Sequence, residues 1–296
     1  MPYAAIALFL VAGLCLSSLD TTAKYLVRDQ SLLIVVWARY AGQMLVVTPF
    51  AWKKVGGGFW RTRRLGLQLL RSTALLLATA FFFAALRFLP LAEASAISFL
   101  SPVIIVLMSG PVLGERPSAA RWIAAIAGFL GILIIVRPGS VVFQPAALMM
   151  VATALCNATY QLLTRKLLDE NVHTTLFYSA LVGTVALSLL WLVLPSSGAS
   201  SLPDLRTAAL FLMLGVFAGT GHWLIIAAYG RAPASLLTPF TYLQMIWATL
   251  FGYLVFGHLP DRWSAIGMSV IVISGLLLAL REQRRFAATN SRRAAP

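Results

Sequence analysis

The stretch Leu91–Pro117, LAEASAISFLSPVIIVLMSGPVLGERP, sets the architecture, because a similar stretch returns in the second half of the chain as Arg231–Pro260, RAPASLLTPFTYLQMIWATLFGYLVFGHLP. In both, a segment rich in small residues is followed by Gly-X-X-Pro and then by a Trp-led segment with spaced glycines. The corresponding residues are Trp122, Gly128 and Gly131 in the first copy and Trp263, Gly267 and Gly275 in the second. Self-similarity at a fixed period is the signature of an internal repeat. We therefore expect one repeat at residues 1–140, a second at 141–281, and a basic tail at 282–296.

Each repeat holds five apolar segments near the roughly 20 residues that a helix needs to cross a bilayer. Charged and Pro- or Gly-containing breaks place these spans at 4–24, 32–52, 66–88, 94–113, 121–137, 145–165, 174–194, 206–229, 234–256 and 263–281. The predicted fold class is an all-α integral membrane protein of ten transmembrane helices. Because five is odd, the second repeat must enter the membrane from the opposite face. Inverted repeats of this kind enclose a central site and are typical of alternating-access carriers.

The composition excludes a soluble globular domain. Hydrophobic residues make up 60% of the 296 residues and charged residues 11%, against roughly half and a quarter in an average soluble domain. The net charge of +14 is carried by the loops and the tail, where basic residues set topology and contact anionic lipid; we expect the bilayer, and not nucleic acid, as the partner. Cys15 and Cys156 lie in apolar segments and are expected to act as small hydrophobic residues.

The distribution of lysine and arginine predicts the orientation, because these residues are retained on the cytoplasmic side. An N-terminus inside the cell places most of the 23 basic residues inside, including the segment 53–64 and the tail from Arg281. We therefore expect a multi-pass protein of the bacterial inner membrane with both termini in the cytoplasm. The tail itself is expected to be solvated and partly disordered.

Two polar stripes interrupt the apolar helices. Ser17, Asp20, Thr21 and Lys24 share one face of the first helix. The matching face of the sixth helix, which is the equivalent helix of the second repeat, carries Asn157, Tyr160, Gln161 and Thr164. Polar groups are costly against lipid, so these faces are expected to line a central cavity. Two alternatives stay open: hydrogen bonding between helices, with an Asp20–Lys24 ion pair, and a Lys24 that reaches the membrane interface.

An arginine inside a span requires a counter-charge or a function. Arg39 lies in the WARY sequence of the second span, where insertion of arginine costs about 2.5–3.5 kcal/mol. Two interpretations are equally supported: Arg39 binds a carboxylate or phosphate of a solute, or it pairs with Asp20. Arg71, just after the basic loop, is expected at the membrane interface.

Aromatic and amide side chains extend the candidate site. Phe82-Phe83 in the third span corresponds to His222-Trp223 in the eighth, and aromatic faces stack on planar or cationic solutes. The ninth span adds Thr238, Tyr242 and Gln244. Pro102 and Pro239 lie inside spans, where they permit kinks that serve gating.

The residues Leu89–Gly139, LPLAEASAISFLSPVIIVLMSGPVLGERPSAARWIAAIAGFLGILIIVRPG, and their second-half counterpart through Gly275 resemble the EamA family of the drug/metabolite transporter superfamily. The resemblance covers nearly the whole chain and implies ten helices in two inverted five-helix repeats around a central cavity. It departs from the family at His258, where the second repeat often carries a glutamate matching Glu115. The sequence SSLDTTAKYLVRD, followed by WARY, also resembles the branch that includes bacterial S-adenosylmethionine and riboflavin carriers.

These observations predict a secondary transporter, and not an enzyme, that moves a small amino-acid-like, S-adenosylmethionine-like or flavin-like solute by alternating access. The alternatives are a lipid-handling membrane protein such as a flippase component, a membrane-embedded enzyme, and a channel. The candidate substrate-binding residues are Ser17, Asp20, Thr21, Arg39, Phe82, Asn157, Tyr160, Gln161, His222, Trp223, Thr238, Tyr242 and Gln244. Coupling to protons or a counter-solute requires an ionisable group, for which Asp20, Glu93 and His222 are the candidates. No ATP-binding or metal-binding motif is present in the sequence, so we expect no cofactor and no metal.

Overall fold

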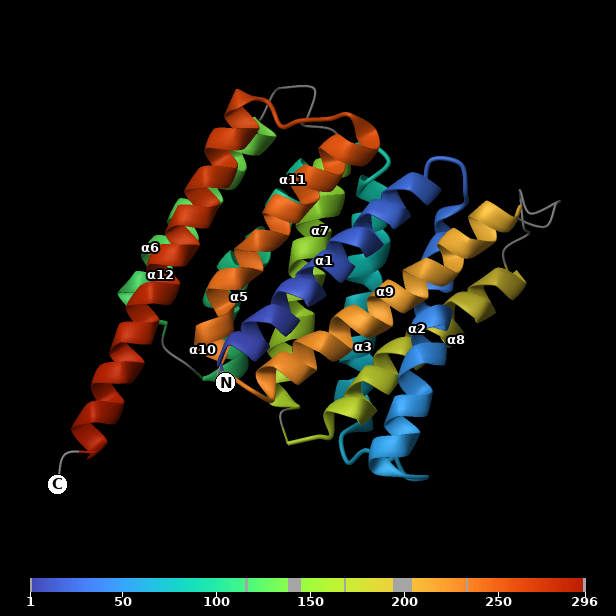
Figure 1. The fold of residues 1–296 in the computed structure, drawn as a ribbon, viewed down its shortest axis with the longest axis horizontal. Helices are drawn as coiled ribbons and strands as arrows, with labels where there is room; N and C mark the ends of the chain where they lie inside the picture. The colour runs from blue at the N-terminus through green and yellow to red at the C-terminus, as the bar shows by residue number, and fades with distance from the viewer. Residues whose placement is uncertain are drawn as a thin grey trace.

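The computed structural model describes residues 2–114, 117–137, 145–167, 169–193, 204–232 and 234–294, and these residues form helices and turns without strands (Figure 1). In chain order the elements are α1 (Pro2–Leu26), α2 (Leu32–Val55), α3 (Leu65–Ala85), α4 (Leu91–Ser98), α5 (Leu100–Leu113), α6 (Ala119–Val136), α7 (Pro145–Lys166), α8 (Val172–Val193), α9 (Leu205–Tyr229), α10 (Ala234–Leu237), the 3₁₀ turn η1 (Thr238–Tyr242), α11 (Leu243–Phe256) and α12 (Arg262–Ala294). Within the described residues, nine helical stretches are long and apolar enough to cross a membrane. The chain is thus an all-helical protein with many membrane-length helices.

Two of the predicted spans are broken helices. The fourth divides into α4 and α5 at Phe99, just before Pro102, whose ring clashes with the carbonyl of Ser98 in a continuous helix. The ninth divides into α10, η1 and α11, with Pro239 near the start of the 3₁₀ turn. The kinks predicted from the two prolines are therefore confirmed, and the second one reduces the apolar α-helix of this segment to a shorter piece.

The helices pack in pairs that bring distant parts of the chain together. The most extensive contacts join α1 to α9, α3 to α7, α6 to α12, and α2 to both α8 and α9. Figure 1 shows α6 and α12 side by side at one edge of the bundle, with α2 and α8 toward the other. Between α6 and α12, a Cβ atom added to Gly131 would lie 2.8 Å from the carbonyl oxygen of Gly267. The glycines of the repeated motif thus allow these two backbones to touch.

The C-terminal tail differs from the expectation. Helix α12 continues without a break through Ala294, where a partly disordered tail was predicted from residue 282. The residues after Arg281 include arginine, glutamate, glutamine and alanine, which favour helix. They extend a helix that is already nucleated inside the bundle, so they add turns at little cost.

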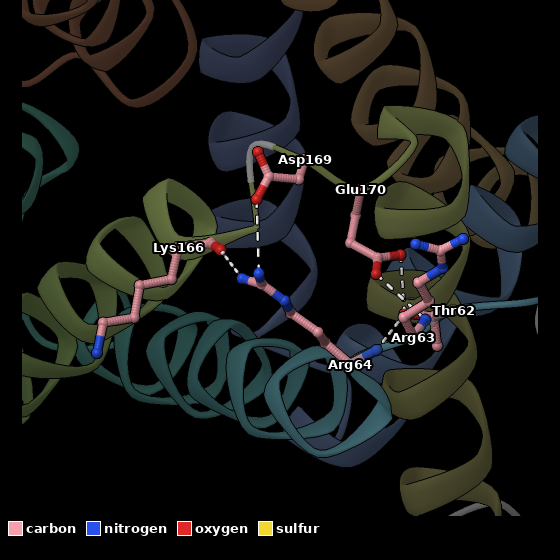
Figure 2. Close-up of polar contacts among 6 residues, drawn as sticks. All are labelled: Thr62, Arg63, Arg64, Lys166, Asp169 and Glu170. Atoms are coloured by element: carbon pink, nitrogen blue, oxygen red, sulfur yellow. Dashed lines mark hydrogen bonds and ion pairs between the residues drawn. The ribbon is translucent and has the colours of Figure 1, made fainter.

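At one end of the bundle, the loop between α2 and α3 binds the loop between α7 and α8 (Figure 2). Thr62 donates a hydrogen bond to Glu170 over 2.9 Å, and the Arg63 backbone N–H donates to the same carboxylate over 3.2 Å. Arg64 donates to the Lys166 carbonyl over 2.8 Å and forms an ion pair of 3.5 Å with Asp169. We call these six residues the loop-to-loop cluster.

Other contacts close the opposite end, where α1 ends and α12 begins. Arg87 donates to the carbonyl oxygens of Val27 and Gln30 over 2.8 and 3.0 Å. Arg137 pairs with Asp261 over 2.6 Å. The Ser264 main-chain N–H, and then Arg137, hold the pKa of the Asp261 carboxyl below its usual range. Both ends are therefore joined by contacts between loops that are far apart in sequence.

Candidate substrate site

The polar stripe of α1 is largely turned away from lipid. Ser17 is 1% exposed and its hydroxyl has no hydrogen-bond partner among the described residues. Thr21 is also buried, but its hydroxyl donates to the Ser17 carbonyl over 2.6 Å and is thus satisfied within its own helix. Asp20 is half-buried, and in the described part of the chain no hydrogen bond or ion pair to its carboxylate is found. The stripe therefore offers one accessible carboxylate to the interior.

Lys24 has a structural role. Its side chain is buried, and its ammonium group donates to two carbonyl oxygens of the turn between α3 and α4 over 2.9 and 2.6 Å. The hydrogen bonding between helices that was left open for this stripe is therefore found at Lys24, whereas in the described residues Lys24 forms no ion pair with Asp20 within 4.0 Å. Lys24 holds the end of α1 to the α3–α4 turn.

Arg39 of α2 is buried with an unpaired guanidinium nitrogen. The side chain is 4% exposed, and one terminal nitrogen lacks a hydrogen-bond partner within the described residues. The guanidinium stacks on the Tyr40 ring at 4.2 Å from the centroid. Tyr40 is itself fully buried, packed on Gly183 and hydrogen-bonded to Thr79 over 3.0 Å. The charge of Arg39 is therefore held on a rigid support.

Arg39 and Asp20, for which an ion pair was one of the two interpretations, do not form that pair among the described residues. Asp20 lies near enough for the Arg39 charge to act on its carboxylate. Yet no ion pair joins their side chains within 4.0 Å among the residues that the structure describes. The two charges face a common region without touching.

Arg71 of α3, for which a position at the membrane interface was predicted, is buried between helices with 2% of its surface exposed. It donates to Thr164 over 2.6 Å and to Tyr160 over 3.0 Å on α7. On α8 it donates to Ser179 over 2.7 Å and to the Thr175 carbonyl over 3.2 Å. These acceptors could not be anticipated from the sequence around Arg71, because they belong to the second half of the chain. Arg71 ties α3 to α7 and α8.

The polar residues on the α7 stripe differ in their surroundings. Tyr160 and Thr164 are occupied by Arg71, and the Arg71 guanidinium also stacks on the Tyr160 ring at 4.4 Å. Asn157 is half-buried and Gln161 is exposed. Of the predicted α7 site residues, Tyr160 is thus the one that contacts the buried Arg71.

His222 and Trp223 of α9 lie in different surroundings. His222 is half-buried, shares a 2.8 Å hydrogen bond with the Ala218 carbonyl, and lies within electrostatic reach of both Arg39 and Arg71. Trp223 is 39% exposed and packs on the exposed Phe50 ring at 5.8 Å. We call Asp20, Arg39, Arg71, Tyr160 and His222 the polar centre. Trp223 lies apart from it in its contacts, and its role in binding stays a prediction.

The remaining predicted residues lie around the kinked segment and α3. Tyr242 stacks on Phe99 with ring centroids 5.1 Å apart, which joins the two helix breaks. Gln244 and Phe82 are half-buried, and Phe82 packs against the apolar core. The side chain of Thr238 lies outside the described residues.

Gln43 is a buried polar residue that the sequence analysis missed. It is fully buried, and both its amide nitrogen and its amide oxygen lack partners in the described residues. It follows Arg39 by one helical turn, so the i, i+4 spacing of two polar residues in an apolar span would have identified it. A buried amide without partners is costly, which makes Gln43 a candidate for contact with a solute.

Two cavities in the described residues have linings that include no residue of the polar centre. A groove of about 510 Å³ lies between α11 and α12 and is lined mainly by apolar side chains. A smaller space of about 50 Å³ lies between α5, α6, η1 and α12. In the described residues no cluster of His, Cys, Asp and Glu side chains is suited to a metal ion.

Known proteins resemble the chain over nearly its whole length. The model of the EamA-like transporter family matches twice, at residues 3–137 and 144–280. The chain belongs to this family. A riboflavin transporter of Vibrio cholerae is 30% identical over 281 residues, 93% of each chain. An S-adenosylmethionine uptake transporter of Rickettsia bellii is 26% identical over 281 residues, again 93% of each.

A solved crystal structure supports the fold of this EamA-like transporter. It is 21% identical, covers 96% of the chain and 100% of its own, and superposes with a TM-score of 0.68. With the family match, the apolar helices define a multi-pass transporter of the inner membrane that carries a small metabolite, and not an enzyme. The resemblance predicted from the repeated motif is therefore confirmed.

Proposed function

We propose that this protein is a secondary carrier that moves a small amino-acid-like, S-adenosylmethionine-like or flavin-like metabolite across the inner membrane by alternating access. The proposal rests on the polar centre: in the described residues, the Asp20 carboxylate has no ion pair and one Arg39 guanidinium nitrogen has no hydrogen-bond partner. Charged side chains at membrane depth are expensive and usually mark a substrate or ion pathway. The riboflavin and S-adenosylmethionine carriers among the relatives support a solute of this size.

Alternating access requires two halves that can exchange roles, and the helix contacts support inverted repeats at 1–140 and 141–281. In this arrangement α1, α2 and α3 of the first repeat correspond to α7, α8 and α9 of the second, α5 corresponds to α11, and α6 to α12. The contact of α1 with α9 then matches the contact of α7 with α3, and the contact of α1 with α11 matches the contact of α7 with α5. Helix α6 packs on its own counterpart, α12. The family model also matches each half separately. A central site between such halves opens to either side by rocking.

The proposed orientation places both termini in the cytoplasm. The segment 53–64 and the tail then lie inside, as the distribution of basic residues requires. The loop-to-loop cluster is on this cytoplasmic side, and the Arg137–Asp261 pair is on the other side. Transport is driven by protons or by a counter-solute, with Asp20, Glu93 and His222 as the ionisable groups. Glu93 in the first turn of α4 is buried, and one of its carboxylate oxygens has no partner in the described residues.

Uptake into proteoliposomes tests the proposal. Purified protein is reconstituted and offered radiolabelled S-adenosylmethionine, amino acids, nucleosides, riboflavin and organic acids in turn. We expect saturable, time-dependent uptake of one class, and stabilisation of the detergent-solubilised protein by the same class, because a ligand that binds the folded state raises its melting temperature. Asp20→Asn and Arg39→Gln should each lower uptake at least tenfold while the melting temperature of the ligand-free protein stays within a few degrees.

Arg206→Gln is the matched control, because it removes an exposed guanidinium in the first turn of α9, outside the polar centre and outside the contacts that close the ends of the bundle. It should leave uptake near the unmodified level. Loss of folding in both polar-centre variants would defeat the assignment of Asp20 and Arg39 to the site.

The groove between α11 and α12 favours lipid handling as the alternative function, because its apolar walls suit an acyl chain. Fluorescent phospholipids in the same proteoliposomes separate the two functions. Protein-dependent movement of lipid between the leaflets, without uptake of any solute in the panel, would overturn the carrier proposal.

A further inference from the structure

The separated charges of Arg39 and Asp20 indicate which chemical class of solute binds at the polar centre. This inference rests on the carrier function proposed above. Arg39 is 4% exposed, and one guanidinium nitrogen has no partner within the described residues. Buried donors are almost always paired, so an unpaired one on a charged group indicates a ligand that is bound there. An arginine fork matches a carboxylate in particular.

A neighbouring amide adds to the same subsite. Gln43 lies one turn further along α2, is fully buried, and has neither amide atom partnered among the described residues. Its amide nitrogen is a second donor on the face of the helix that carries Arg39. Two donors without partners are thus presented from one rigid helix, and the stack of Arg39 on Tyr40 at 4.2 Å holds the charge in place.

The negative charge nearby limits which anion can bind. Asp20 lies within electrostatic reach of Arg39, is half-buried, and has no ion-pair or hydrogen-bond partner on its carboxylate in the described residues. A simple anion on Arg39 would be repelled by Asp20. A group that carries an ammonium beside its carboxylate would instead meet an opposite charge on each side.

We propose that Arg39, assisted by Gln43, binds the carboxylate and Asp20 binds the ammonium of a solute with a free α-amino acid group. The zwitterion lies between the two side chains and forms one ion pair with each of them. The other members of the polar centre are held near this pair of charges, because Tyr160 is hydrogen-bonded to Arg71 and His222 lies within electrostatic reach of Arg39.

A set of matched ligands tests the inference on the full-length wild-type protein. The probes are S-adenosyl-L-methionine, its decarboxylated form, 5′-methylthioadenosine, L-methionine and riboflavin. Apparent affinities come from the ligand concentration needed to raise the melting temperature and from inhibition of uptake. We expect S-adenosyl-L-methionine or L-methionine to bind, and removal of the carboxylate to weaken binding tenfold to a hundredfold, because a charged hydrogen-bonded group is lost.

The variants assign the loss to particular side chains. In Arg39→Gln the decarboxylated ligand should bind as well as S-adenosyl-L-methionine, so that the ratio of the two affinities falls to about one. Arg39→Lys keeps the charge without the fork and should give an intermediate ratio. Asp20→Asn should weaken binding of the amino acid probes about tenfold. It should leave unchanged the ratio between the affinities for S-adenosyl-L-methionine and for its decarboxylated form. Arg137→Gln, outside the polar centre, should preserve every ratio.

Two outcomes overturn the inference while the carrier function stands. One is equal binding of S-adenosyl-L-methionine and its decarboxylated form by the wild-type protein, a result that does not depend on how any variant folds. The other is transport of riboflavin with no binding of either amino acid probe. If the protein neither binds nor transports any solute in either panel, the proposed function itself fails.

Discussion

Two buried arginines show how the same residue type is used in opposite ways. Arg71 makes four hydrogen bonds to neutral acceptors on α7 and α8, so its charge is satisfied by dipoles that belong to the fold. Arg39, at a similar burial, has one guanidinium nitrogen without a partner in the part of the chain that the structure describes. The first residue therefore stabilises the bundle, and the second is available to a solute.

The roles of the two arginines predict different effects of mutation. Arg71→Gln leaves several buried acceptors of α7 and α8 without a donor, and should cost about 3 kcal/mol of stability. We expect a melting temperature several degrees lower in detergent, with a smaller loss in Arg71→Lys, which retains the charge. Lys53→Gln, which removes an exposed charge at the end of α2, is the control. Equal melting temperatures for Arg71→Gln and the wild type would show that the four hydrogen bonds contribute nothing net.

At the scale of the helices, close packing depends on glycine where α2 crosses α9. A Cβ atom added to Gly215 would lie 2.3 Å from the Cα atom of Gly42, and one added to Gly42 would lie 2.7 Å from the Cα atom of Gly215. Both obstacles are backbone atoms, which cannot move aside as a flexible side chain does. This crossing positions His222 on α9 relative to Arg39 on α2.

Gly215→Ala should therefore force α2 and α9 apart and destabilise the protein by about 1–3 kcal/mol, the usual cost of overpacking. The melting temperature in detergent measures it, and uptake should fall as the polar centre loses its geometry. Gly128→Ala on α6 is the matched control, since an added Cβ there meets no atom within 4 Å. Alanine favours helix over glycine, so this control should keep or slightly raise stability. Equal melting temperatures of Gly215→Ala and Gly128→Ala would contradict a steric limit where α2 crosses α9.

On the scale of the whole molecule, the structure joins loops at both ends of the bundle, and a carrier must release each end in turn. The loop-to-loop cluster connects α2–α3 to α7–α8 through side chains on the surface (Figure 2). Surface ion pairs of this kind are weak, at about 0–1 kcal/mol each. The cluster can therefore open at low cost during transport.

Cross-linking this end should stop transport if the halves alternate. Thr62→Cys and Glu170→Cys, placed in a Cys15→Ala and Cys156→Ala background, are joined with a reducible thiol reagent, because these side chains meet at 2.9 Å in the native protein. We expect uptake to fall below about a tenth and to return after reduction, since rocking of the halves requires this end to open. The Thr62→Cys single variant, treated in the same way, should transport normally. Full activity of the cross-linked protein would exclude opening at this end.

Some members of the polar centre stand out in the sequence and others do not. Asp20, Arg39 and His222 were predicted because ionisable and polar groups in apolar spans are rare, so each one is conspicuous. The hydrogen bonds of Arg71 and the burial of Gln43 were not predicted. Whether such a side chain is satisfied depends on acceptors from other helices, and helical periodicity in one segment carries no information about them.

The amino-acid sequence alone was enough to locate the apolar segments and the family, because hydrophobic length and motif spacing can be measured along the chain without knowing how it packs. It also predicted kinks at Pro102 and Pro239, since proline acts on its own helix. The packed bundle was needed to show that Arg71 is satisfied and that Arg39 and Asp20 stand apart. Those facts depend on distances between helices, which follow from the packing of all the helices together and not from the pattern within any one of them.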